Sequence, residues 1–169
     1  MKDQFNTYLL KELQQGQAVI DRVKYFHDAY THLLPEPIDD LLLADYFLAD
    51  GTREFDELWF FTSHFVGLVT NFLSVESPRL EVFNFVGRIF YYRLEPIEYD
   101  LRFPPPGEES AEPRQSGPNA RLTLTFGYYT GIGEGSIRAA AGNCDALHTI
   151  ILKYFRRWLV DLGTATGVA

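Results

Sequence analysis

The 169-residue sequence has a single cysteine, Cys144, and no apolar run of the roughly 20 residues that a membrane-spanning helix needs. One cysteine cannot form a disulfide within the chain, and it excludes every zinc site built from two or more cysteines. The N-terminus lacks the basic start and apolar core of a secretory signal. From these absences we expect a cytoplasmic protein.

Basic residues are also scarce, because 15 Lys and Arg stand against 23 Asp and Glu, which gives a net charge of −8. Residues 1–34 are neutral, residues 35–113 carry −11 and residues 114–169 carry +3. Nucleic acids and anionic lipid surfaces are bound mainly through Lys and Arg, so the acidic middle disfavours both as partners. Charge segregated in this way can also steer self-association.

No motif of a catalytic, metal or cofactor site is recognised. His27 and His32 are five residues apart, which misaligns them on a helix face, and the other two histidines also lack metal-ligand spacing. The glycine-rich turn expected at 131–135 has neither the dinucleotide-binding spacing nor a phosphate-loop lysine. Ser136 is not in a Gly-x-Ser-x-Gly motif. The four histidines considered are His27, His32, His64 and His148. We therefore expect a non-enzymatic protein without catalytic residues, cofactor or metal.

Cys144 and a group of three acidic residues are the candidates for a chemical role that remain. Cys144 lies where the last helix is expected to begin, and a helix N-terminus favours the thiolate. No histidine adjoins it in the sequence, so a small packed residue is the preferred interpretation. Glu95, Glu98 and Asp100 suggest paired carboxylates for acid–base chemistry. Arg102 continues the strand face of Glu98 and Asp100, and this fits a solvated surface better.

An amphipathic helical stretch is predicted at 3–34, where apolar residues advance by three, four or six positions. Gly16 divides this stretch into two helices or weakens a single one, and Pro35 and Pro37 end it. Packing against the sheet of the same molecule is the preferred role of its stripe, and docking to a second copy or a partner helix is the alternative. The stripe comprises Phe5, Leu9, Leu13, Val19, Val23, Phe26, Tyr30 and Leu33.

A second amphipathic helix is predicted at 143–159, with apolar residues at the i, i+3, i+4, i+7 spacing. Gly142 and Asn143 supply the break and the expected N-cap, and Asp145 is favourably placed in the first turn. The expected apolar face comprises Leu147, Ile150, Ile151, Tyr154, Phe155, Trp158 and Leu159. The expected polar side comprises His148, Lys153, Arg156 and Arg157.

Short strands are predicted between the two helices. Their expected ranges are 41–49, 58–62, 65–72, 80–86, 88–93, 97–103, 121–129 and 136–140. The pair Asp50-Gly51 indicates a hairpin, and the alternation within 97–103 predicts a half-buried antiparallel strand. The polar stretch 104–119 is expected to be a mobile loop inside the domain. Because crossover helices are missing, the order excludes a parallel α/β fold and predicts the α+β class.

This order of strands followed by one helix resembles the pleckstrin-homology-like (PH-like) superfamily, particularly its bacterial domains. Residues 58–69, LWFFTSHFVGLV, look like the family's aromatic strand, threonine-led turn and apolar strand. Residues 136–147, SIRAAAGNCDAL, look like its last strand and the start of its capping helix. The resemblance covers roughly residues 40–160 and implies an antiparallel β-barrel or sandwich of about seven strands, capped by the C-terminal helix, in a domain at 37–162. The N-terminal helical extension expected at 1–36 is not explained by the resemblance, and a tail is expected at 163–169.

The resemblance also implies a binding or assembly module, since such domains are seldom enzymes, and we expect protein–protein contacts that include self-association. Phosphoinositide binding in this family uses several Lys and Arg around the first hairpin loop. The corresponding stretch 50–57 has one basic residue, Arg53, among four acidic ones, so a polyphosphate should be repelled. The alternative is a cone-shaped, cystatin-like α+β fold, in which aromatic strands line a cavity for a small molecule and the long helix packs against a concave sheet.

Overall fold

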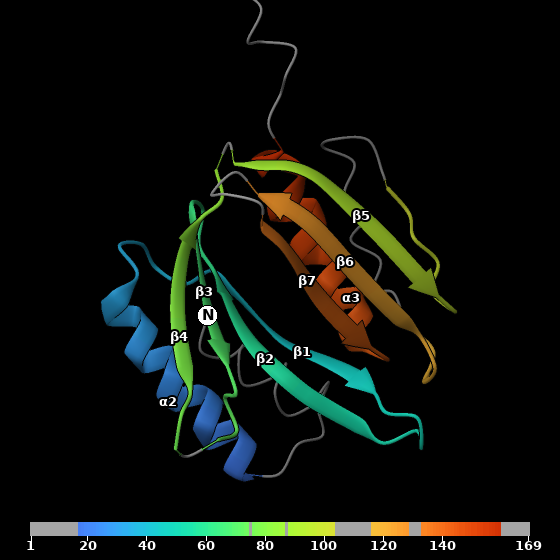
Figure 1. Cartoon of the computed structure of the whole chain (residues 1–169), viewed down its shortest axis with the longest axis horizontal. Coiled ribbons are helices and arrows are strands. Elements are labelled where there is room, and N and C mark those ends of the chain that lie inside the picture. Colours follow the sequence, from blue (N-terminus) through green and yellow to red (C-terminus); the bar gives the residue numbers. More distant parts are fainter. Residues whose placement is uncertain (1–16, 75, 87, 104–115, 129–132, 160–169) are drawn as a thin grey trace, which may run out of the picture.

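The structure, a computed structural model, describes residues 17–74, 76–86, 88–103, 116–128 and 133–159. In chain order its elements are α2 (Gln17–Leu33), β1 (Asp40–Phe47), β2 (Arg53–Phe61), β3 (Phe65–Thr70), β4 (Arg79–Asn84), β5 (Ile89–Ile97), β6 (Arg121–Tyr128), β7 (Gly133–Ala140), α3 (Asn143–Ile150), the π-helical segment η2 (Ile151–Phe155) and α4 (Arg156–Trp158). The last three are consecutive and form the expected C-terminal helix (Figure 1). The predicted α+β class is confirmed.

The described strands form two antiparallel sheets, one in the order β1-β2-β3-β4 and the other in the order β5-β6-β7. Because β1 lies beside β7, β4 and β5 are the two outer edges of the arrangement (Figure 1). Of the two predicted forms, barrel or sandwich, a closed barrel is therefore wrong. Leu159, at the end of the helical segment, forms a bridge with Ile89 at the start of β5. This bridge gives the start of β5 a neighbour other than β4, so the sheets stay open on that side.

A buried carboxylate joins the two sheets where β1 meets β7. Asp45 lies at an irregularity in the pairing of β1 with β2 and is inaccessible to solvent. Its Oδ1 accepts hydrogen bonds from the backbone N–H of Ala140 at 2.9 Å and from the side-chain amide of Asn143 at 3.1 Å. Its Oδ2 pairs with the guanidinium of Arg53. Polar side-chain contacts therefore hold the two sheets together at this line.

Aromatic side chains fill the space between the sheets and the C-terminal helix. Six of the seven residues predicted for the apolar face of that helix are buried, whereas Leu159 is exposed. Phe85, from the β4–β5 connection, meets Phe126, Phe155 and Trp158 at ring-centroid distances of 5.4, 6.4 and 5.9 Å. Aromatic pairs of this kind contribute about 0.5–1.5 kcal/mol each beyond the area they bury. The C-terminal helix is thus part of the main core.

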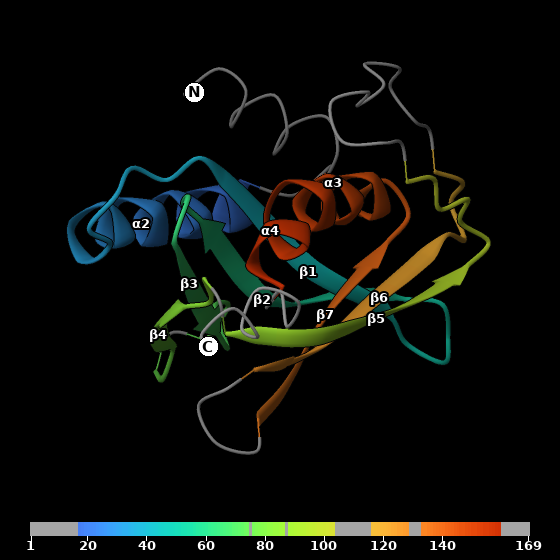
Figure 2. The same ribbon diagram turned by 90° about the horizontal axis from the view of Figure 1, so that it is seen from above.

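A second core lies between α2 and the four-stranded sheet, at one end of the molecule (Figure 2). Successive residues of β2 belong to different cores: Leu58 and Phe60 pack with α2, whereas Trp59 and Phe61 pack with the second sheet and the C-terminal helix. A strand that is buried on both faces has a continuous run of apolar residues in its sequence, and residues 58–61 form such a run.

Packing against the sheet of the same molecule, the preferred role of the N-terminal stripe, is confirmed within α2. Val23, Phe26 and Tyr30 are buried against the sheet, and Val19 is half-buried beside them. Leu33 departs from the prediction, because 56% of it is exposed. Residues 1–16, including Gly16, lie outside the described residues, as do 104–115 of the expected loop and the tail at 163–169.

The predicted strand at 97–103 is wrong. β5 instead continues through Pro96, which an edge strand tolerates because one side of its backbone has no partner strand. It ends just before Glu98, whose φ of 50° turns the chain. Tyr99 and Leu101 still pack against the main core. Ile97 and Phe103, at the two ends of the predicted inward face, are about half exposed, so only its two middle residues pack inward.

The predicted glycine-rich turn at 131–135 is wrong in its second half, because Gly133 and Gly135 lie in β7. They stand opposite Tyr128 and Phe126 of β6. An added Cβ would lie 2.5 Å from the Tyr128 ring at the first glycine and 2.6 Å from the Phe126 ring at the second. Glycine therefore leaves room here for two aromatic rings of the neighbouring strand.

Two predictions for polar residues of the last helix are also wrong. Asn143 does not cap the helix: Gly142 is the N-cap, and the buried Asn143 amide donates to a backbone carbonyl of β1 at 2.8 Å. His148, expected on the polar side, is buried. The segment after β5 covers it, with the Tyr99 hydroxyl 3.0 Å from Nδ1 and the Phe103 ring at 5.5 Å.

Candidate functional site

The residues first considered for chemistry do not converge on one site. His27 and His32 lie on α2, His64 lies in the β2–β3 turn and His148 lies in α3. Within the described ranges, no three His, Cys, Asp or Glu side chains are grouped so that they could hold a metal ion. Ser136 is exposed on β7. No described helix is both long enough and apolar enough to cross a membrane.

Cys144 is a packed residue rather than a reactive one. Burial raises the pKa of its thiol to about 12, and this outweighs the preference of a helix N-terminus for the thiolate. Its Sγ lies 3.5 Å from the carbonyl oxygen of Ala139, to which the thiol donates. A neutral, buried thiol is a poor nucleophile.

The acidic residues around the end of β5 form solvated ion pairs. Asp100 pairs with Arg102 at 2.6 Å, and Glu95 lies 3.9 Å from Arg93. All four side chains are more than half exposed, and each carboxylate lies beside an arginine in contact with solvent. The interpretation as a solvated surface fits this geometry.

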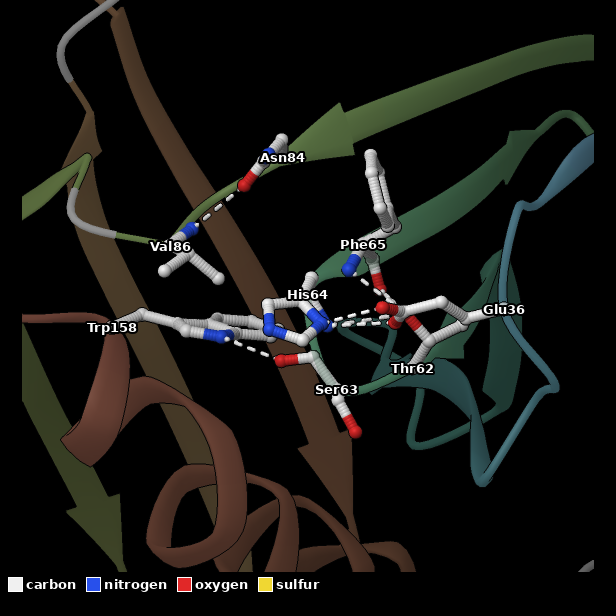
Figure 3. A network of polar contacts seen from close by, with 8 residues as sticks. All are labelled: Glu36, Thr62, Ser63, His64, Phe65, Asn84, Val86 and Trp158. Atoms are coloured by element: carbon white, nitrogen blue, oxygen red, sulfur yellow. Dashed lines mark hydrogen bonds and ion pairs between the residues drawn. The ribbon is translucent and has the colours of Figure 1, made fainter.

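Glu36 organises the most extensive polar network around the β2–β3 turn (Figure 3). Its Oε2 accepts from the Thr62 hydroxyl at 2.7 Å and from the His64 backbone N–H at 3.1 Å, while its Oε1 lies 2.5 Å from His64 Nδ1. These hydrogen bonds, that of Thr62 foremost, lower the pKa of the Glu36 carboxyl. Trp158 completes the network by donating from Nε1 to the carbonyl of Ser63 at 3.3 Å.

The Glu36 network joins a carboxylate to an imidazole, but it lacks a nucleophile. The Ser63 hydroxyl points away from the imidazole of His64 (Figure 3), and the imidazole side chain is 57% exposed. Every contact of the carboxylate goes to the turn itself. Its role is therefore to fasten the turn to the segment between α2 and β1, beside the end of the C-terminal helix.

A second polar cluster fastens the chain on both sides of residues 104–115 to α3. The Tyr99 hydroxyl donates to Asp145 Oδ1 at 3.0 Å and lies 3.0 Å from Nδ1 of His148. Ser116 donates to Asp145 Oδ2 from its backbone N–H at 3.1 Å and from its hydroxyl at 2.8 Å. The Asp145 carboxylate thus connects two segments that lie far apart in the sequence.

Tyr30 fixes the outer strand of the four-stranded sheet. Its buried hydroxyl accepts from the Glu81 N–H at 3.0 Å, and it lies 2.6 Å from the carbonyl oxygen of Leu68 and 2.9 Å from that of Glu81. Leu68 of β3 and Glu81 of β4 are directly paired, so the hydroxyl supplements the ladder at this point. Burial raises the pKa of Tyr30 to about 12, which keeps this donor protonated at neutral pH.

The outer strand, β4, exposes apolar side chains. Leu80 is 40% exposed and Val82 is 45% exposed. They pair with Val69 and Gly67 of β3, and Val69 packs with α2 while the Gly67 backbone underlies the Tyr30 ring. Because side chains alternate between the faces of a sheet, Leu80 and Val82 share the face that α2 covers. Although they lie on this face, Leu80 and Val82 stay partly exposed.

Exposed apolar residues of α2 and of the β3–β4 turn accompany this edge. Arg22 donates to the backbone carbonyls of Phe72, at 2.7 Å, and of Ser74, so α2 lies against the turn that leads into β4. Tyr25, one helical turn further, is 63% exposed. The β4–α2 surface is defined as the exposed apolar residues Tyr25, Leu33, Leu73, Leu80 and Val82.

Comparison with known proteins found no matching family model, no similar curated protein and no similar solved structure. The β4–α2 surface was not recognised from the sequence, although one signal for it is present. A glycine inside an apolar strand indicates close approach of another group, here Gly67 and the Tyr30 ring. The sequence predicts a strand at 80–86, but no local pattern identifies it as an outer strand of its sheet.

Proposed function

We propose that this chain is a non-enzymatic PH-like binding or assembly module that acts through protein–protein contacts, and that the β4–α2 surface is its contact surface. The order of four strands, three strands and a terminal helix supports the PH-like part of the proposal. The position of α2 supports it as well, since this helix packs on the outer face of the first sheet, away from the C-terminal helix.

One observation carries the proposed contact surface: an outer strand with exposed apolar side chains is flanked by exposed apolar residues of a helix. An open sheet edge is a template for another strand, and proteins commonly protect such edges with charges, proline or a covering element. β4 carries the charged residues Arg79 and Glu81, but Leu80 and Val82 remain exposed at its edge. Exposed apolar groups that cluster on several elements are typical of interaction sites.

The cystatin-like alternative requires aromatic strands that line a cavity. The described aromatic residues between the sheets contact one another instead, as in the pairs Phe126–Phe155 at 5.0 Å and Phe61–Tyr154 at 5.2 Å. Rings in contact fill a core. This packing favours the binding module over a small-molecule cavity.

Phosphoinositide binding is not part of the proposal. Arg53 is the one basic residue of the stretch 50–57, and its guanidinium pairs with the buried Asp45 and donates to the carbonyl of Ala140 at 3.1 Å. It is therefore committed to the junction of the two sheets and not presented to a phosphate.

Site-specific cross-linking tests the proposed surface. A photoreactive phenylalanine analogue is placed at Leu80 in the full chain, and at the exposed Ser136 of β7 in a control chain. Both proteins are irradiated in a lysate of the source cells, and the adducts are identified by mass spectrometry. We expect adducts at position 80 that are absent at position 136 and that disappear when Val82→Lys is added to the same chain.

The identity of each adduct separates the possible outcomes. Adducts at position 80 with another protein or with a second copy support a protein-binding surface, provided that Val82→Lys removes them. Equal adducts at positions 80 and 136, no adducts at 80, or adducts that survive Val82→Lys would refute the assignment of the surface.

A further inference from the structure

Resting on the proposed function, we propose that the partner at the β4–α2 surface is a second copy of this chain. In this dimer the two β4 strands pair in antiparallel orientation about a two-fold axis at Val82. The pairing joins the two four-stranded sheets into one continuous sheet across the dimer.

The direction of the backbone groups decides which residues of β4 can pair with a new strand. Glu81 directs its N–H and C=O toward the Tyr30 hydroxyl and its partner Leu68 in β3. Backbone groups alternate in direction along an antiparallel strand. Those of Leu80 and Val82 therefore point away from β3, toward the outer edge. The same two residues carry the exposed apolar side chains.

The register follows from comparing the symmetric pairings centred on residues 80 to 83. A pairing centred on Phe83 would place Leu80 opposite Val86, whose backbone N–H already donates to Asn84 Oδ1 at 3.1 Å. A pairing centred on Glu81 would place two glutamates directly opposite each other, which is destabilising. A pairing centred on Leu80 would place Val82 opposite Pro78, which has no N–H to donate. A pairing centred on Val82 sets Leu80 opposite Asn84 of the second copy, so every outward backbone group finds a partner. We therefore place the axis at Val82.

Symmetry also explains why α2 contributes exposed apolar residues. The two-fold axis of an antiparallel strand pair is perpendicular to the sheet, so each copy keeps α2 on the same face of the joined sheet. The two α2 helices then lie on the same side of the joined β4 strands, and Leu33 and Tyr25 are close to apolar groups of the other copy. A single extended peptide would pair with β4 but leave both residues uncovered. A second copy supplies the strand and the covering helix together.

The local charge is compatible with this arrangement although the chain is acidic. β4 itself carries one basic residue, Arg79, and one acidic residue, Glu81. α2 carries two basic residues, Arg22 and Lys24, and two acidic residues, Asp21 and Asp28. The edge thus avoids the concentrated negative charge that would keep two copies apart.

Molar mass in solution tests the dimer. Light scattering after size exclusion is measured for the full chain over a hundredfold range of concentration, together with Val82→Lys, Val82→Glu and the control Ser136→Lys. We expect twice the monomer mass for the wild type and for the control. Each Val82 variant should raise the dissociation constant by about tenfold or more, because two like charges meet at the axis.

Mixing the two Val82 variants tests the register. At the proposed axis residue 82 faces residue 82 of the other copy, so an equimolar mixture of Val82→Lys and Val82→Glu should regain the dimer through opposite charges. Failure of the mixture to associate, while each variant is folded by circular dichroism, would overturn the pairing at Val82. A wild type that is monomeric at every concentration would overturn self-association, even if a Val82 variant did not fold.

These results are distinguishable from failure of the proposed function. A monomeric wild type that still forms adducts with another protein from position 80 retains the β4–α2 surface as a binding site and loses only the second copy as the partner. A wild type without adducts at position 80 and without self-association loses both.

Discussion

The contact between Tyr30 and Gly67 offers a sharp test of the packing beneath β4. In Gly67→Ala the added Cβ would lie 2.5 Å from Cε1 and 2.6 Å from Cδ1 of the Tyr30 ring. The ring is completely buried, lies 5.1 Å from the Phe60 ring and is held at its hydroxyl by β3 and β4. It therefore cannot move aside without breaking other contacts.

The expected magnitude has two parts. Overpacking a tight core costs about 1–3 kcal/mol. Displacing the ring also withdraws its hydroxyl from the Glu81 N–H and the Leu68 carbonyl, and a buried polar group without a partner costs about 1–3 kcal/mol. We expect Gly67→Ala to lower the free energy of unfolding by about 2–4 kcal/mol. Tyr30→Phe, which removes only the hydroxyl, should lower it by about 1–2 kcal/mol.

Urea unfolding followed by the fluorescence of the two buried tryptophans measures both changes. Gly117→Ala is the matched control, because a Cβ at Gly117 would have no heavy atom within 4 Å. We expect this control to lie within about 0.5 kcal/mol of the wild type. A Gly67→Ala variant as stable as the Gly117→Ala variant would show that the ring does not lie over Gly67 as described.

Three further predictions concern ionisable groups. The pKa of Tyr30 is about 12 in the folded protein and about 10 when unfolded, so its contribution to stability is lost as pH rises from 10 to 12. The wild type should lose about 2 kcal/mol relative to Tyr30→Phe over this range, so its advantage of about 1–2 kcal/mol in urea unfolding should disappear or reverse. Asp45→Asn leaves the guanidinium of Arg53 without its buried carboxylate and should lower the free energy of unfolding, measured by thermal unfolding, by about 3–5 kcal/mol. The control Asp100→Asn, in an exposed ion pair, should lower it by less than about 1 kcal/mol. Cys144 should react with a thiol reagent only after denaturant unfolds the protein, and rapid labelling of the folded chain would contradict its burial.

The strands that the sequence predicted well are those in which apolar periodicity and turn residues agree. The Asp50-Gly51 hairpin is present, with a φ of 84° at Gly51, and the strand predicted at 121–129 is present as β6. The apolar spacing of the last helix was also sufficient to identify its buried face. In these segments the local pattern and the tertiary environment favour the same structure.

The failed predictions concern residues whose structure is determined by contacts with segments distant in the sequence. Asn143 has the residue type of an N-cap, but the carbonyls and carboxylate of β1 compete for its amide. His148 has the spacing of a solvent-facing residue, but the chain after β5 folds over it. Gly133 and Gly135 look like a turn because the rings that need their space belong to another strand. None of these partners is adjacent in the sequence, so no local pattern reveals them.

The structure also changes how assembly can be studied in this chain. α2 presents a buried side, with Phe26 and Tyr30 packed on the sheet, and exposed apolar residues, Tyr25 and Leu33. Packing within the molecule and contact with a partner are therefore not exclusive roles for this helix. A chain that begins at Pro35 would uncover the second core and should aggregate whether or not the protein self-associates. Only substitutions at the edge of β4, where side chains are exposed and the fold does not depend on them, can separate assembly from folding.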